Sequence, residues 1–345
     1  MSKFKYAFSF LILLVSCKSN QLSGKIENAV EENSKQIIKI AFGSCNKHDV
    51  TNVFWDDILR YQPDIFIWGG DNIYADTDDM VKLKAMYRAQ NAIPAYAKLK
   101  ENVTITGVWD DHDYGLNDGG VEFEAKKESQ EAFYDFMGLA KNDKWRKKEG
   151  TYSTVSIQKD FGAVKILNLD TRYFRSTLKQ SEVKGKRYEA DSDPSKTILG
   201  DAQWKWLERE LTNSTAEFNI LVSSIQFLSS EHGFEKWANF PKEVEKLKDI
   251  IKKSKAKGVI ILSGDRHISE FSVDKNFANP LVDFTSSGLT HAYTSFTSEP
   301  NRYRVGKVIS TTSYGIVELN LKSKEVVFKI MGDNEQILEQ YKQMY

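Results

Sequence analysis

The sequence predicts one large α/β domain built around two β-sheets, and three observations support this. From residue 37 onwards, short apolar segments rich in β-branched residues alternate with amphipathic segments of helical period. Several of the apolar segments stop abruptly at glycine or acidic residues. The 345 residues are 41% hydrophobic and 12% aromatic, which is enough for a sizeable core. No repeat or linker divides the chain after residue 36, so we expect a single domain over 37–345.

The expected strands share an apolar, β-branched character. They cover 37–42, 64–68, 103–109, 152–157, 164–169, 219–223, 259–262, 281–285, 315–319 and 325–330. We expect the last two to pair as a hairpin across 320–324.

The expected helices carry apolar residues at spacings of three and four. They cover 53–60, 79–91, 95–100, 122–137, 201–213 and 241–256. Three stretches, 113–150, 174–195 and 288–313, do not fit the alternation and follow strand ends. We expect long loops there that shape access to a site.

The N-terminus has the pattern of a bacterial export signal. Lys3 and Lys5 precede an apolar run over 6–15, and a Leu-Val-Ser-Cys sequence ends at Cys17. Because this sequence is similar to a lipobox, we expect a lipoprotein signal peptide over 1–17 with the lipid on its cysteine. The alternative is an ordinary signal peptide in which the cysteine is incidental.

Residues 18–36 are polar and lack hydrophobic periodicity, which predicts a flexible tether. We therefore expect an exported protein that a lipid on Cys17 anchors to a bacterial membrane. Lys+Arg and Asp+Glu both total 48, so the chain carries no nucleic-acid-binding signature. We expect a monomer.

Four of the expected strands end in side chains that commonly bind metal ions. These are Cys45, Asp71 with Tyr74, Asp111 with His112, and Asp265 with His267, and Asn117 follows within the stretch 113–150. In open α/β sheets, ligands bind at the carboxyl ends of the strands. The sequence therefore predicts one site assembled from four strand ends.

The side chains of this site differ in the metals they prefer. The oxygens of Asp71, Asp111, Asp265 and Asn117 suit Ca²⁺, Mg²⁺ or Mn²⁺. The thiolate of Cys45 and the phenolate of Tyr74 favour a more highly charged ion such as Fe³⁺, and Asp71 is the best candidate to bridge two ions. Alternatively, Cys45 is a small buried hydrophobic residue at a strand end.

Two or more metal ions at one edge indicate phosphoryl chemistry. His112 would then hydrogen-bond a phosphate oxygen or protonate the leaving group. Arg172 offers a planar fork for phosphate, and the alternative is a structural ion pair with Asp170. His291 follows another strand end and either lines the site or packs beside it.

Six motifs in consistent order resemble those of the PhoD-like alkaline phosphatases and phosphodiesterases, a branch of the calcineurin-like metallophosphoesterases. They are GSC at 43–45, GDNIYAD at 70–76, WDDHDYGLND at 109–118, LDTRYFR at 169–175, LGDAQWKWL at 199–207 and SGDRH at 263–267. The resemblance covers about residues 37–330 and implies a four-layer α-β-β-α sandwich that holds Fe³⁺ with Ca²⁺.

The resemblance also implies roles for individual residues. Metal ligands would be Cys45, Asp71, Tyr74, Asp265 and His267, with Asp111 where related enzymes have an Asn ligand. Arg172 and His112 would face the phosphate.

Two features depart from the family pattern. The founding enzymes carry an extra N-terminal β-sandwich, whereas only the tether precedes the domain here. Their acidic motif usually reads Asp-Asp-His-Glu followed by paired Asn, whereas this chain has Asp113 and then Asn117-Asp118. The second-site metal is therefore open between Ca²⁺, Mg²⁺, Mn²⁺ and Zn²⁺.

We expect a membrane-anchored enzyme that hydrolyses phosphate monoesters or diesters through in-line attack by a metal-activated hydroxide. One alternative is a hydrolase of other esters, such as sulfate esters, on the same metal platform. Another is a non-catalytic lipoprotein that binds metal at the cell surface.

Overall fold

The computed structural model describes residues 36–345, in which thirteen strands form two sheets. The first sheet contains β1 (Ile37–Gly43), β2 (Ile65–Gly69), β3 (Thr104–Val108), β11 (Tyr314–Asn320), β12 (Glu325–Met331) and β13 (Ile337–Met344). The second contains β4 (Ser153–Lys159), β5 (Gly162–Asn168), β6 (Phe218–Val222), β7 (Val259–Ser263), β8 (Ser269–Asp274), β9 (Leu281–Ser286) and β10 (Arg304–Ile309). Their strand orders are β13-β12-β11-β1-β2-β3 and β10-β8-β9-β7-β6-β5-β4.

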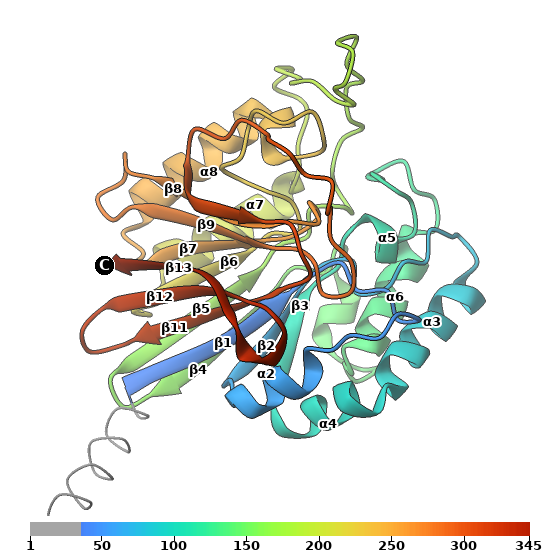
Figure 1. Cartoon of the computed structure of the whole chain (residues 1–345). Helices are drawn as coiled ribbons and strands as arrows, with labels where there is room; N and C mark the ends of the chain where they lie inside the picture. The colour runs from blue at the N-terminus through green and yellow to red at the C-terminus, as the bar shows by residue number, and fades with distance from the viewer. Residues whose placement is uncertain (1–35) are drawn as a thin grey trace, which may run out of the picture.

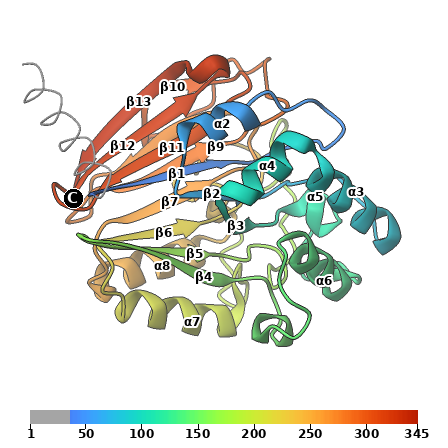
Figure 2. The ribbon, with the colours of Figure 1, turned by 90° about the horizontal axis from the view of Figure 1, so that it is seen from below.

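Helices cover the outer faces of both sheets (Figures 1 and 2). The first sheet packs against α2 (Trp55–Tyr61), α3 (Met80–Ala92), α4 (Pro94–Asn102) and α6 (Lys126–Phe136). The second packs against α7 (Gly200–Thr212) and α8 (Pro241–Ser254). Shorter pieces are α5 (Asp111–Tyr114) and three 3-10 segments, Lys144–Lys147, Trp237–Asn239 and Asp333–Glu335. The four layers confirm the expected α-β-β-α sandwich.

The central strands are buried on both faces because each contributes to two hydrophobic cores. In β2, Ile65 and Ile67 face the core between the sheets, while Phe66 and Trp68 face the helices. Strands covered on both sides read as continuous apolar runs rather than as alternating ones. This explains why the short apolar segments of the sequence predicted these strands correctly.

Three strands were not expected from the sequence: β8, β10 and β13. The stretch 288–313, expected to be a loop throughout, contains β10, and the expected hairpin of β11 and β12 continues into β13. Residues 1–35, which carry the expected signal peptide, Cys17 and nearly all of the tether, lie outside the described part. Within 36–345, no helix is both long and apolar enough to cross a bilayer.

The carboxyl ends of the parallel strands in both sheets lie at one edge of the sandwich. Strands β1, β2 and β3 run parallel, as do β5, β6, β7 and β9. At this edge a parallel bridge pairs Ser44 with Ser287, and Ser44 Oγ donates to the Ser286 carbonyl at 3.1 Å. The two sheets are therefore joined directly beside the residues that follow β1 and β9.

Candidate active site

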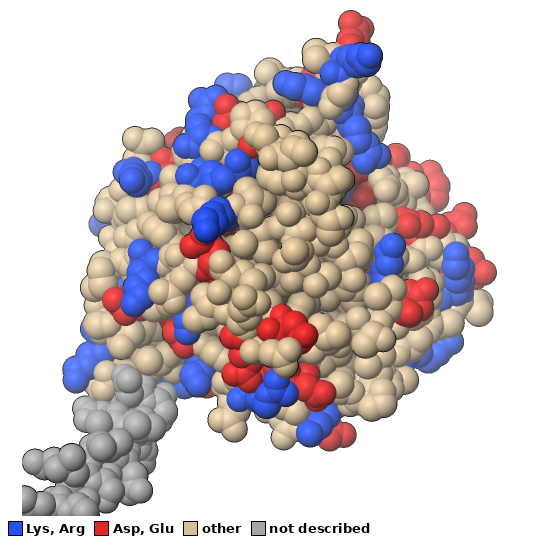
Figure 3. Space-filling model, viewed as in Figure 1, with Lys and Arg blue, Asp and Glu red and all other residues tan. Residues whose placement is uncertain are grey.

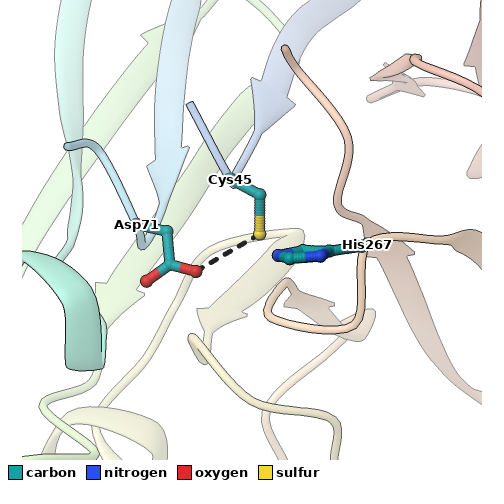
Figure 4. Close-up of side chains that lie close together, drawn as sticks. All are labelled: Cys45, Asp71 and His267. Atoms are coloured by element: carbon teal, nitrogen blue, oxygen red, sulfur yellow. Dashed lines mark hydrogen bonds between the residues drawn. The ribbon is translucent and has the colours of Figure 1, made fainter. Parts of the chain in front are cut away.

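Strand ends from both sheets place the expected metal ligands close together. Cys45 follows β1, Asp71 follows β2, and Asp111 begins α5 just after β3. From the second sheet, Asp265 and His267 follow β7. Figure 4 shows the side chains of Cys45, Asp71 and His267 converging on one point from these separate segments.

Four of these residues have backbone conformations that side chains rarely adopt. The φ angles are 60° at Cys45, 51° at Asp71, 68° at Asp265 and 53° at His267. A left-handed conformation costs a non-glycine residue on the order of 1–3 kcal/mol and is concentrated at functional sites. The preceding Gly70 has φ of 99°, and a Cβ there would lie 2.6 Å from Asp110 Cβ. The chain therefore bends sharply after each strand to aim a ligand at the site.

The first group of ligands surrounds Asp71. Its Oδ2 atom lies 3.3 Å from Cys45 Sγ and 3.3 Å from the Tyr74 hydroxyl, which in turn lies 2.9 Å from His267 Nε2. One ligand atom each from Cys45, Asp71 and His267 lie within 4.8 Å of one another. Thiol, carboxylate, phenol and imidazole thus converge on one volume.

Two further groups of ligand atoms adjoin the first. Ligand atoms of Asp71, Asp111 and His112 form one, and those of Asp110, Asp111 and Asp265 form the other, each within 4.8 Å. Asp71 and Asp111 therefore each belong to two groups, as a bridging carboxylate would. The Oδ1 atom of Asp71 is in addition buried and has no hydrogen-bond partner, an arrangement that suits a cation.

The electrostatics of the site also fit bound cations. Burial raises the pKa of Asp71 well above its usual range, and the nearby charges of Cys45 and Asp111 raise it further. Burial also raises the pKa of Cys45 to about 11 and that of Asp265 to about 7. Such a concentration of buried acids is destabilising without positive charge, and a bound cation reverses this by favouring the deprotonated ligands. The donor set therefore fits metal ions.

His112 is held at the edge of the site by a residue that sequence reasoning did not assign. Its Nδ1 atom lies 2.8 Å and 2.9 Å from the two carboxylate oxygens of Asp76. Burial acts to lower the pKa of His112, but the Asp76 hydrogen bond and the Asp111 charge outweigh it and raise the pKa to about 9. The signal was present in the sequence, since Asp76 is the last residue of the GDNIYAD motif.

A pocket of about 450 Å³ opens onto these residues. Of the expected site residues it is lined by Asp111, His112, Asn117, Asp265 and His267. Further lining residues that were not expected are Asp118, Arg187, Glu235 and Arg266. Asn117 is exposed at the pocket wall, and Asp118 accepts a hydrogen bond from Tyr188 at 2.8 Å.

Arg172 does not line this pocket. Its guanidinium is fully buried beneath the site and pairs with Asp110 and, at 2.6 Å, with Glu235. The alternative partner considered from the sequence, Asp170, instead accepts backbone N–H groups of Arg172 and Tyr173 and the Trp109 indole N–H. The position of Arg172 is therefore that of a structural ion pair, with Asp110 and Glu235 as its partners.

The two remaining residues, His291 and Asp113, lie outside the groups of candidate ligands. The His291 ring packs against the rings of Tyr74 and His267, with centroid distances of 5.0 Å and 4.4 Å. It therefore packs beside two candidate ligands. Asp113 is buried away from the pocket, where it accepts hydrogen bonds from Asn72 and Tyr87.

Two solved structures share this two-sheet fold. The fold is similar to that of a dimetal phosphatase from Danio rerio, with a TM-score of 0.55 and 12% identity over 89% of this chain and 99% of that one. It is similar to the solved structure of PhoD, with a TM-score of 0.66 and 18% identity over 90% and 68% of the two chains. The chain therefore shares its fold with PhoD and with this dimetal phosphatase.

Comparison of the sequence with known families identifies the family of this chain. Residues 40–327 match the family model of the PhoD-like phosphatases, and the chain belongs to that family. It is 27% identical over 287 residues to alkaline phosphatase D of Bacillus subtilis, covering 74% of this chain and 47% of the relative. The chain thus spans about half the length of this curated relative.

Proposed function

We propose that this protein is a metal-dependent hydrolase of phosphate monoesters or diesters. The observation that carries the proposal is Asp71, which belongs to two ligand groups, keeps one buried oxygen unpartnered, and lies near His112 at the mouth of a pocket. Membership of the PhoD-like phosphatase family supports the same reaction class.

The donor atoms support Fe³⁺ beside a second cation. Thiolate, phenolate, imidazole and carboxylate from Cys45, Tyr74, His267 and Asp71 suit the ferric ion. The oxygens of Asp111, Asp265 and Asn117 suit Ca²⁺, with Mg²⁺, Mn²⁺ or Zn²⁺ as alternatives. When bound, such ions neutralise phosphate charge and activate water for attack on phosphorus.

The protein's own groups carry the remaining tasks. His112 lines the pocket, and with Nδ1 fixed by Asp76 its Nε2 atom can deliver a proton to the departing oxygen. Arg187 and Arg266 also line the pocket, where each pairs with a carboxylate, Arg187 with Asp118 and Arg266 with Glu299, both at 2.7 Å. Arg172 acts indirectly, because it orients Asp110 and Glu235 from below.

We further propose that the protein is exported and anchored through a lipid on Cys17, on the strength of the sequence pattern over 1–17. Fractionation of cells that express the full chain tests this location. Cys17→Ser should move the protein from the membrane fraction to the soluble fraction. Membrane association that survives the substitution contradicts the anchor.

The test of the activity compares 4-nitrophenyl phosphate, bis(4-nitrophenyl) phosphate and 4-nitrophenyl sulfate with the metal-replete full chain. We expect hydrolysis of at least one phosphate ester in clear preference to the sulfate ester. Asp71→Asn should lose both metal and activity, whereas the exposed Asp49→Asn should keep both. Preference for sulfate would favour the alternative ester hydrolase, and metal binding without any hydrolysis would favour the non-catalytic lipoprotein.

A further inference from the structure

A second pocket, of about 550 Å³, shares a wall with the candidate active site. It lies by the long stretch between β5 and α7, part of which projects as the yellow-green loop at the top of Figure 1. Lys and Arg side chains stand along this loop in Figure 3. None of the candidate metal ligands lines this pocket, so its lining requires a separate explanation.

Two chain segments form the wall between the pockets. In each segment, one residue lines the active-site pocket and its neighbour in the sequence lines the second pocket. Arg187 lines the active site, while Lys186 before it lines the second pocket. Similarly, Glu235 lines the active site, while Lys236 after it lines the second pocket. The segments are joined because the Arg187 N–H donates to the Gly233 carbonyl at 2.8 Å. The two pockets are therefore neighbours with separate linings.

His232 provides the second pocket with a hydrogen-bond donor that has no partner. The residue is only 4% exposed. Its Nδ1 atom accepts the backbone N–H of Phe234 at 3.2 Å, so the neutral ring carries its proton on Nε2. Nε2 is buried and makes no hydrogen bond. A buried donor of this kind is costly unless a ligand accepts from it.

Lys236 provides a buried positive charge. It is 5% exposed, and its Nζ atom donates to the Phe234 carbonyl at 2.9 Å. Among the ion pairs of residues 36–345, none includes Lys236. Burial lowers its pKa to about 8, and the charges of Lys186 and Arg266 contribute to this shift. A buried ammonium group without a carboxylate is stabilised by an anion.

The acidic residues of the pocket already have cationic partners. Glu189 pairs with Lys179 at 2.8 Å, and Glu231 pairs with Arg302 at 3.1 Å. These carboxylates therefore leave the donors of Lys236 and His232 for a ligand. Both donors suit the same kind of ligand, one with several acceptor oxygens and a negative charge.

We propose that the second pocket binds an oxyanion of the phosphate class between Lys236 and His232. Two sources supply this chemistry: free inorganic phosphate, and a second phosphate group on the substrate. Both of these sources rest on the proposed hydrolysis. The binding site itself is defined by Lys236 and His232 and does not depend on that reaction.

Isothermal titration of the full chain with inorganic phosphate tests the site. We expect binding to persist in Asp71→Asn, because the pocket is separate from the metal ligands. Lys236→Gln and His232→Phe should each weaken this binding at least tenfold, while the exposed Lys242→Gln should leave it unchanged. Absence of binding in Asp71→Asn, or wild-type binding in both pocket variants, overturns the proposal. Failure of the hydrolysis proposal would instead appear in the ester assays.

Structure determination covers the case in which the pocket variants do not fold. A crystal of the wild-type chain grown with phosphate should show the anion against Lys236 Nζ and His232 Nε2. A pocket without it at saturating phosphate overturns the proposal.

Kinetics with the Lys236→Gln variant distinguish the two sources. If a second substrate phosphate occupies the pocket, KM should rise at least tenfold more for a sugar bisphosphate than for 4-nitrophenyl phosphate. If free phosphate occupies it, a non-competitive component of phosphate inhibition should be lost instead. Either result supports the site, and kinetics identical to those of the wild type in both assays contradict it.

Discussion

The carboxylate of Asp76 holds the Nδ1 atom of His112 through contacts of 2.8 Å and 2.9 Å. This pairing fixes the ring so that its other nitrogen is available to the pocket that His112 lines. Asp76 has φ of 42°, a conformation that Asn also tolerates well. An Asp76→Asn substitution therefore removes the charge and keeps the backbone.

We expect Asp76→Asn to lower kcat by about tenfold or more, because an oriented general acid contributes about 10²–10⁴-fold to such a reaction. KM should change much less, since Asp76 does not line the pocket. Steady-state kinetics with 4-nitrophenyl phosphate provide the measurement. The exposed Asp78→Asn is the matched control. A kcat equal to that of the control would refute the positioning role.

Replacing Arg172 should affect stability strongly. Arg172→Met leaves Asp110 buried without its cation and leaves Glu235 with Arg175 alone, a change that costs about 3–5 kcal/mol of unfolding free energy. Denaturant unfolding measures the loss, and the exposed Arg209→Met should stay within about 0.5 kcal/mol of the wild type. A stable Arg172→Met variant with only a raised KM would instead support direct contact with phosphate.

Tyr74 should determine the colour of the metal-replete protein. If its phenolate binds Fe³⁺, the wild type absorbs visible light and Tyr74→Phe loses that absorbance. Absorption spectra with elemental analysis provide the measurement, and Tyr293→Phe serves as the control, because Tyr293 lines the active-site pocket and is not a candidate ligand. A colourless, iron-free and active wild type would show that Tyr74 has another role.

Lys148 should make stability depend on pH. Burial lowers its pKa in the folded protein to about 7, below the value of about 10.4 in an unfolded chain. Between these values the unfolded state binds more protons, so the stability of the folded protein rises with pH.

Wild type should therefore gain up to about 1 kcal/mol per pH unit relative to Lys148→Met above pH 7. Urea unfolding at a series of pH values measures the difference. The exposed Lys144→Met should follow the wild-type pH dependence. Parallel curves for wild type and Lys148→Met would contradict the lowered pKa.

Most of the strands that carry the site could be predicted from the sequence, because strands covered on both faces are continuous apolar runs. Strand β8 was missed for the opposite reason. It is fully buried, yet four of its six residues are polar or charged, among them Glu270, which pairs with Arg304. The partner that allows Glu270 to be buried lies 34 residues away and cannot be identified from hydropathy. The segment therefore did not resemble a buried strand.

Two of the four edge strands, β10 and β13, were missed for a different reason. All residues of β10 and β13 are exposed or half-buried, and none is fully buried. Neither segment therefore contains the continuous apolar run of a buried strand. An edge strand is held by pairing with a neighbour, as β13 is by β12. Nothing within such a segment encodes that neighbour.

The expected ligands illustrate what short motifs can predict. Cys45, Asp71 and His267 come together because parallel strands end at the same edge, which is a rule of the fold. The direction in which Arg172 points depends instead on Asp110 and Glu235 from two other segments. From the sequence alone, the guanidinium of Arg172 could bind either a phosphate or a carboxylate, because its planar fork fits both.

The bridge between Ser44 and Ser287 has a consequence for folding. The candidate ligands lie on both sides of this seam, with Cys45 and Asp71 on the first sheet and Asp265 and His267 on the second. An ion held by all of them would act as a removable cross-link between the halves of the sandwich, closing a very long loop of chain. The supply of metal in the compartment where the chain folds would then govern how firmly the two sheets stay together.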